Sequence, residues 1–109
     1  MIRVENRRTY KGTGVYVGRP TPLGNPFKVP RGYDHANDPD GVLEKYRIWL
    51  RGRMSDPDSW QAKIMSGLVK ASNLSGDLVL ICWCAPKRCH ADVIREEIES
   101  ARKAAGRNP

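Results

Sequence analysis

The alternation of apolar and polar residues predicts three strands in this chain. Short β-branched and aromatic runs at residues 2–6 (IRVEN) and 14–18 (GVYVG) are bounded by polar residues or glycine, as strands usually are. Residues 77–84 (DLVLICWC) form a nearly continuous apolar run, which is typical of a central parallel strand buried on both faces. Residues 18–41 hold five prolines and four glycines, a density that excludes regular elements.

Apolar residues at helical spacing predict a first helix over residues 42–54, with Asp38 or Asp40 as its N-cap. The residues expected on its apolar face are Val42, Leu43, Tyr46, Trp49 and Leu50. The opposite face carries the cations Lys45, Arg47 and Arg51. We therefore expect this helix to pack on the core with a basic outer surface.

Two further helices are predicted by the same reasoning. One would start at Ser55 or Asp56, with Pro57 in its first turn. Its core-facing residues would be Trp60, Ile64 and Leu68. The last helix would run from about residue 90 to residue 104 and end near Gly106.

The order strand, strand, helix, helix, strand, helix predicts a small α/β fold. We expect a layered single domain, residues 1–109, in which a short, mostly parallel sheet is covered by about three helices. Residues 105–109 would form a flexible tail. In such sheets, ligands bind at the carboxyl ends of strands, where helix N-termini open.

The charge of the chain favours a polyanionic partner. With 19 Lys and Arg against 12 Asp and Glu, the formal net charge is +7, and from residue 1 to residue 32 the only acid is Glu5. We expect nucleic acid, a nucleotide or a phosphorylated surface as the partner, although such charge also keeps small proteins soluble. Because no stretch reads as a signal peptide or a membrane span, we expect a cytoplasmic protein with no membrane partner.

All three cysteines and one of the two histidines lie close together, at Cys82, Cys84, Cys89 and His90. In one interpretation, Cys89 is a nucleophile whose pKa is lowered by a helix N-terminus and by neighbouring cations, with His90 as proton carrier. The same amides and cations would hold a phosphate.

Three other interpretations of this cluster stay open. The four side chains are an accepted zinc ligand set, although Cys89 and His90 are adjacent, which rarely suits one tetrahedral ion. Cys82 and Arg88 also match the spacing of a phosphatase loop, a pattern that arises easily in so basic a chain. Alternatively, Cys82, Cys84 and Cys89 are small buried core residues and His90 caps the helix.

The segment VYVGRPTPLGNPF, residues 15–27, is the second unusual stretch. Gly18 and Gly24 permit close backbone approaches, and the prolines stiffen the segment. A stiff loop that presents Arg19 and Asn25 suits recognition of an anion or a base edge. The alternative is a rigid cover over the core, anchored by apolar side chains.

Taken together, VYVGRPTPLGNPF and CWCAPKRCHADVI, with YRIWL between them, resemble an uncharacterised family of small proteins from bacteria and their phages, domain of unknown function 4326. The resemblance spans roughly residues 14–98 and implies no activity.

We therefore expect the two motifs to meet at one edge of the sheet and form a pocket that recognises phosphate. The recognition residues would be Gly18, Arg19, Gly24, Asn25, Lys87 and Arg88. The residues of any catalytic chemistry would be Cys89, His90 and Asp92, where Asp92 orients the imidazole or caps the helix. One alternative is a non-enzymatic basic phage protein that binds nucleic acid or a host factor through Lys45, Arg47, Arg51 and the C-terminal tail. Another is a metal-binding domain.

Overall fold

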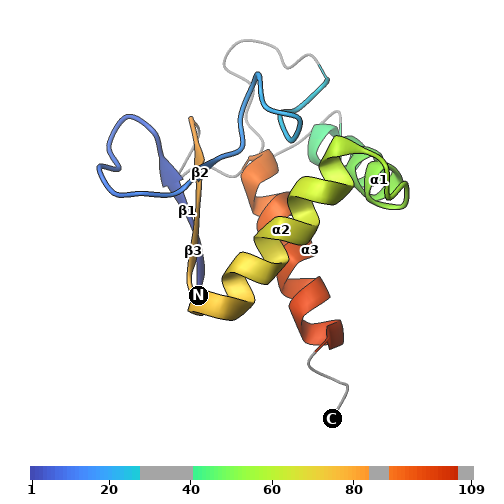
Figure 1. The fold of residues 1–109 in the computed structure, drawn as a ribbon. Helices are drawn as coiled ribbons and strands as arrows, with labels where there is room; N and C mark the ends of the chain where they lie inside the picture. Colours follow the sequence, from blue (N-terminus) through green and yellow to red (C-terminus); the bar gives the residue numbers. More distant parts are fainter. Residues whose placement is uncertain (28–40, 84–88, 106–109) are drawn as a thin grey trace.

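Three short parallel strands form the sheet in the described part of the chain. The computed structural model describes residues 1–27, 41–83 and 89–105. Strands β1 (Ile2–Asn6), β2 (Val15–Tyr16) and β3 (Leu78–Cys82) lie in the order β1-β3-β2 (Figure 1). Both neighbours pair parallel to β3. The prediction of a short parallel sheet with the third strand at its centre is confirmed.

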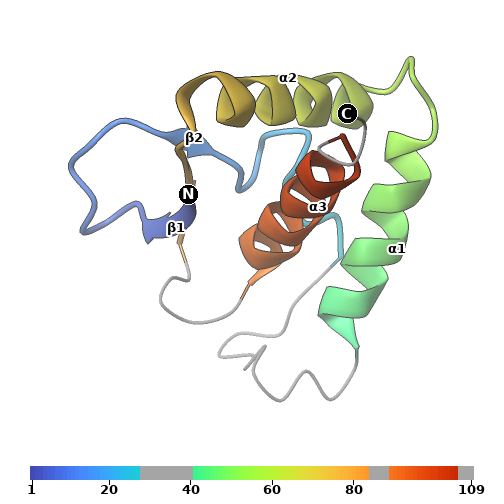
Figure 2. The ribbon, with the colours of Figure 1, turned by 90° about the horizontal axis from the view of Figure 1, so that it is seen from below.

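The helices are α1 (Val42–Met54), α2 (Trp60–Ser75) and α3 (His90–Ala105). All three lie on the same side of the sheet, so the molecule has two layers (Figure 1). Seen from below, α3 sits in the angle between α1 and α2 (Figure 2). This is a small α/β domain, as the order of elements predicted.

The two faces of the sheet differ in burial. On β3, Leu78, Leu80 and Cys82 are buried, whereas Val79 and Ile81 are half-buried. The prediction that this strand is buried on both faces is therefore wrong for the face that bears Val79 and Ile81, because the helices cover only the other face (Figure 1). We call the uncovered side the open face.

The core fills the space between the sheet and the helices. Its members among the fully buried side chains include Val17, Leu50, Leu80, Cys82, Cys89, Val93, Ile94 and Ile98. Tyr46 is also 0% exposed, and its hydroxyl donates a hydrogen bond to the carbonyl oxygen of Leu23 at 2.6 Å. This bond ties the segment after β2 to helix α1.

The start of α2 differs from the prediction. Ser55 and Asp56 do not cap it; Ser59 is the N-cap, and its hydroxyl oxygen accepts a hydrogen bond from the amide of Ala62 at 3.0 Å. The same hydroxyl donates to the carbonyl of Arg53 at the end of α1, which fixes the turn between the helices. Trp60, expected in the core, is 68% exposed because it lies in the first turn after this later cap.

Two smaller predictions also change. The second strand is shorter than the predicted residues 14–18, because only Val15 and Tyr16 pair with β3 and the chain turns at Gly18. Helix α1 begins after Gly41, whose φ of 64° lies in the left-handed region. The expected caps Asp38 and Asp40 lie outside the described residues, as do residues 106–109 of the expected tail.

No helix in residues 1–27, 41–83 and 89–105 is long and apolar enough to cross a membrane.

Candidate functional site

The carboxyl ends of the three strands meet at one edge of the sheet, because the strands are parallel. We call this the carboxyl edge. The chain leaves it at Arg7, Val17 and Trp83, directly after β1, β2 and β3. Segment 17–27 and the first turn of α3 lie at the same end of the molecule (Figure 1). This is where ligands bind in open parallel sheets.

His90 connects segment 17–27 with the start of α3. Its Nε2 atom lies 2.8 Å from the carbonyl oxygen of Val17. A carbonyl only accepts hydrogen bonds, so Nε2 carries the hydrogen in this contact. The imidazole also packs edge-on against the ring of Tyr46, with 5.3 Å between ring centroids. The expected meeting of the two motifs is present, and the histidine acts there as a structural donor.

Both described cysteines are sealed in the core. Cys82 and Cys89 are thiols with 0% exposure. Tyr46 lies near Cys89, and burial, reinforced by this thiol, raises the pKa of the Tyr46 hydroxyl well above its usual value. A nucleophile must touch the atom it attacks, and the sulfur of Cys89 does not reach the surface. The geometry favours the interpretation in which these two cysteines are core residues.

Asp92 caps helix α3. Its Oδ2 accepts a hydrogen bond from the backbone amide of Cys89 at 2.9 Å, and its own amide donates to the carbonyl of Cys89 at 3.0 Å. This is half of a capping box, in which the acidic residue of the first turn satisfies the N-cap amide. Of the two roles expected for Asp92, capping is the one that the contacts describe.

The metal hypothesis gains no support from the described ligands. Within residues 1–27, 41–83 and 89–105, no group of three or more Cys, His, Asp or Glu side chains is placed to hold an ion. One of the four expected zinc ligands, Cys84, lies outside the described residues. Lys87 and Arg88, expected to bind phosphate, also lie outside them.

Arg19 braces its own loop. Its Nε donates to the carbonyl of Asn25 at 2.7 Å, and its Nη2 donates to the carbonyl of Phe27 at 2.6 Å. The Asn25 side chain, 8% exposed, accepts a hydrogen bond from the amide of Phe27 at 2.9 Å. These contacts account for Arg19 and Asn25 as parts of a rigid loop, the alternative interpretation of this segment.

The two glycines of the loop allow close packing. A Cβ on Gly18 would lie 2.5 Å from the hydroxyl of Tyr16, and a Cβ on Gly24 would lie 3.0 Å from the backbone of Arg19. Both residues are buried. Contacts within the protein therefore explain why both positions are glycine, and no ligand is needed to account for them.

A cluster of cations and aromatic rings occupies the carboxyl edge, and the sequence reasoning missed it. We call it the Trp83 cluster; it comprises Arg7, Arg8, Tyr16 and Trp83. The guanidinium carbon of Arg7 lies 4.7 Å from the ring centroid of Tyr16 and 5.5 Å from that of Trp83. That of Arg8 lies 5.9 Å from Trp83. These are cation–π distances.

Strand pairing explains how the Trp83 cluster forms. Glu5 of β1 and Tyr16 of β2 both pair with Ile81 on β3, and side chains alternate between faces. The residues two positions after Glu5 and Ile81 are Arg7 and Trp83, so they share the open face with Tyr16. Alternation in three parallel strands was the signal that could have found this cluster.

Residues 2–100 match the protein family described as Domain of unknown function (DUF4326). The chain belongs to this family. The match covers nearly the whole chain and confirms the resemblance carried by the two motifs. Neither the curated proteins nor the solved structures gave a match. Since the DUF4326 description carries no activity, the function must be inferred from geometry and charge.

Two of the three cations on the basic face of α1 in this DUF4326 domain, Arg47 and Arg51, form ion pairs with α3. Arg47 pairs with Glu96, and Arg51 Nε lies 2.6 Å from Glu97 Oε1. The expectation that Arg47 and Arg51 contact a partner is weakened, because each has an acidic partner on α3. Lys45 is exposed, and that part of the expectation stays a prediction. Within the described residues, the cations of the Trp83 cluster face aromatic rings and form no ion pair.

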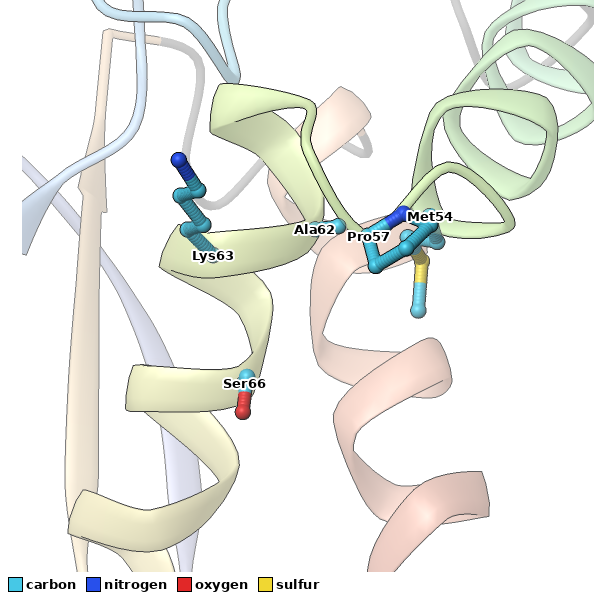
Figure 3. A pocket seen from close by; sticks show the side chains of 5 residues that line it. All are labelled: Met54, Pro57, Ala62, Lys63 and Ser66. Carbon is cyan, nitrogen blue, oxygen red and sulfur yellow. The ribbon is translucent and has the colours of Figure 1, made fainter.

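An open hollow of about 410 Å³ lies in the helical layer of the DUF4326 domain, where α1 ends and α2 begins (Figure 3). Its lining among the described residues is Met54, Pro57, Ala62, Lys63 and Ser66. This set offers no thiol, imidazole or carboxylate for chemistry. The Trp83 cluster is therefore the better candidate site.

Proposed function

We propose that this domain binds the phosphates of a nucleotide or nucleic acid at the carboxyl edge of its sheet. The observation that carries the proposal is the pair of adjacent arginines, Arg7 and Arg8, held at this edge without a carboxylate partner among the described residues. On α1 and α3, by contrast, Arg47, Arg51 and Arg95 form ion pairs with acidic residues of the helical layer. These three arginines thus have acidic partners, whereas Arg7 and Arg8 face aromatic rings.

The backbone supports a fixed position for these cations. The amide of Arg7 donates to the carbonyl of Cys82 at 2.7 Å, and that of Arg8 donates to Asn6 Oδ1 at 2.8 Å. Because the start of the loop is ordered by these bonds, little conformational entropy is lost when an anion binds. Lys11 adds a further exposed cation to the same loop.

The proposal is for binding and does not extend to a reaction. The Cys89 thiol is sealed, and His90 uses Nε2 to hold the Val17 carbonyl. A nucleic-acid partner agrees with the expected cytoplasmic location and with a bacterial or phage source, which the family resemblance implies.

Salt-dependent binding tests the proposal. We expect a fluorescent single-stranded oligonucleotide to bind with an affinity that falls as the salt concentration rises. The double variant Arg7→Ala/Arg8→Ala should reduce the slope of log affinity against log salt concentration by about 1.4, because each lost phosphate contact accounts for about 0.7. The matched control is Lys63→Ala/Lys70→Ala, which removes the same charge from exposed positions of α2. An equal reduction in both double variants, or no binding by the unaltered protein, would refute the proposal.

A further inference from the structure

We infer that the Trp83 cluster is a stacking platform for the bases of single-stranded nucleic acid. This inference rests on the proposed function and names its substrate class. Phosphate contacts alone would serve duplex and single strand alike, whereas an exposed aromatic ring beside arginines adds a surface for unpaired bases.

Exposure is the first observation. Trp83, directly after β3, is 51% exposed, whereas Cys82, the last residue of the strand, is 0% exposed. An indole that is half exposed at the centre of a sheet edge leaves a large apolar surface available to a ligand. Open sheet faces with exposed aromatic residues bind single strands by stacking two or three bases.

Rigidity is the second observation. The indole Nε1 of Trp83 donates to the hydroxyl of Tyr16 at 2.9 Å, and that hydroxyl donates to the carbonyl of Arg19 at 2.7 Å. The backbone carbonyl of Trp83 accepts a hydrogen bond from Asn6 Nδ2 at 3.1 Å. Both rings are therefore positioned before any ligand arrives, and ordering them adds little to the cost of binding.

The rigid loop after β2 supports the platform. The Tyr16 hydroxyl bonds to Arg19, whose guanidinium in turn holds the carbonyls of Asn25 and Phe27. Gly18 leaves room for the Tyr16 ring. Segment 15–27, expected from its sequence to recognise an anion, would thus act indirectly: it fixes Tyr16, which orients the indole of Trp83.

The arrangement of charge and ring selects the partner. Arg7 lies within cation–π distance of both rings and Arg8 of one, so a base on the platform would bring its phosphates close to two cations. An acidic peptide would satisfy the cations but would leave the indole uncovered. Single-stranded nucleic acid supplies both the planar base and the anion.

The test compares bases with phosphates. The probe is an oligodeoxythymidylate of about 12 nucleotides, within the range of known site sizes, and the comparison is an abasic strand of the same length and charge. We expect Trp83→Ala to weaken binding of the oligodeoxythymidylate by about 5- to 150-fold, the effect of losing one stacked base, and to change binding of the abasic strand little. Trp83→Phe, which keeps a stacking ring, should retain most of the affinity. An RNA strand of the same length should behave similarly.

Trp60→Ala is the matched control, since Trp60 is 68% exposed and also has a cation, Lys63, 5.4 Å from its ring. Unchanged circular dichroism of each variant shows that the fold is intact. If the abasic and thymidylate strands bind equally, or if Trp60→Ala weakens binding as much as Trp83→Ala, the stacking inference is wrong while the proposed phosphate binding stands. If neither strand binds, both are wrong.

Discussion

Replacing Tyr46 with phenylalanine removes one oxygen from the centre of the molecule. Tyr46 is 0% exposed, and the hydroxyl is the one polar group of its side chain. This hydroxyl donates a hydrogen bond to the carbonyl of Leu23 at 2.6 Å. Tyr46→Phe keeps the ring and its edge contact with His90, so the change isolates the hydrogen bond between α1 and segment 17–27.

The expected loss follows from what the substitution leaves behind. A buried carbonyl that loses its donor costs about 1–3 kcal/mol. For a domain of this size, that corresponds to a melting temperature lower by roughly 5–15 °C. Urea unfolding followed by circular dichroism measures the change in the free energy of unfolding directly.

Tyr10→Phe is the control, because the hydroxyl of Tyr10 also donates to a backbone carbonyl, that of Thr13, at 3.1 Å, but in a half-exposed position. Water can replace that bond, so we expect a loss below about 0.5 kcal/mol. Equal stability of Tyr46→Phe and the unaltered protein, or an equal loss in Tyr10→Phe, would refute the reasoning.

The pH dependence gives a second readout of the same residue. Burial, and then Cys89, raise the pKa of Tyr46 in the folded protein above its ordinary 10.0. Above pH 10.0 the unfolded chain releases the phenolic proton of Tyr46, whereas the folded chain keeps it. The contribution of the Tyr46 hydroxyl to the free energy of unfolding is therefore fully present below pH 10.0 and is lost as the pH rises further. The gap in stability between the unaltered protein and Tyr46→Phe should narrow above this pH, by at most about 1.4 kcal/mol per pH unit. A constant gap would contradict the burial argument.

The remaining predictions concern glycines and thiols. Gly67→Ala, in the middle of α2, has open space around the added methyl group and should stabilise the fold by about 1 kcal/mol. Gly18→Ala should destabilise the fold by about 1–3 kcal/mol, because its methyl group would overlap the ring of Tyr16. Urea unfolding measures both changes. The reverse order would show that segment 17–27 is not packed as described. In a Cys84→Ser variant, Cys82 and Cys89 should react with an aromatic disulfide reagent only as fast as the protein unfolds, because both are 0% exposed. Fast labelling of either thiol in the native state would restore the nucleophile hypothesis.

The sequence predicted the sheet well because its signals are local. The apolar run of residues 77–84 marked the central strand, and the order of elements indicated parallel pairing. The start of α2 was less predictable. Ser55, Asp56 and Pro57 have the local character of a helix start, but the bond from Ser59 to the carbonyl of Arg53 selects a later cap. That bond depends on where α1 ends.

The candidate site was harder to predict than the fold. Sequence reasoning followed residue types with reactive side chains and so pointed to Cys89 and His90, which the fold uses for burial and for a contact between segments. The Trp83 cluster depends instead on the register between strands that are distant in the sequence. Arg7 and Trp83 meet only because β1 and β3 pair in parallel and end together.

The most direct test of the central claim is the nuclear magnetic resonance spectrum of the indole Nε1–H groups during titration with single-stranded oligodeoxythymidylate. The chain has three tryptophans, so each indole can be assigned by substitution. We predict that the Trp83 signal shifts with the ligand, and that those of Trp49 and Trp60 stay in place. A shift of Trp60 without Trp83, or saturated binding that leaves the Trp83 signal unmoved, would contradict a base-binding platform at the carboxyl edge of the sheet.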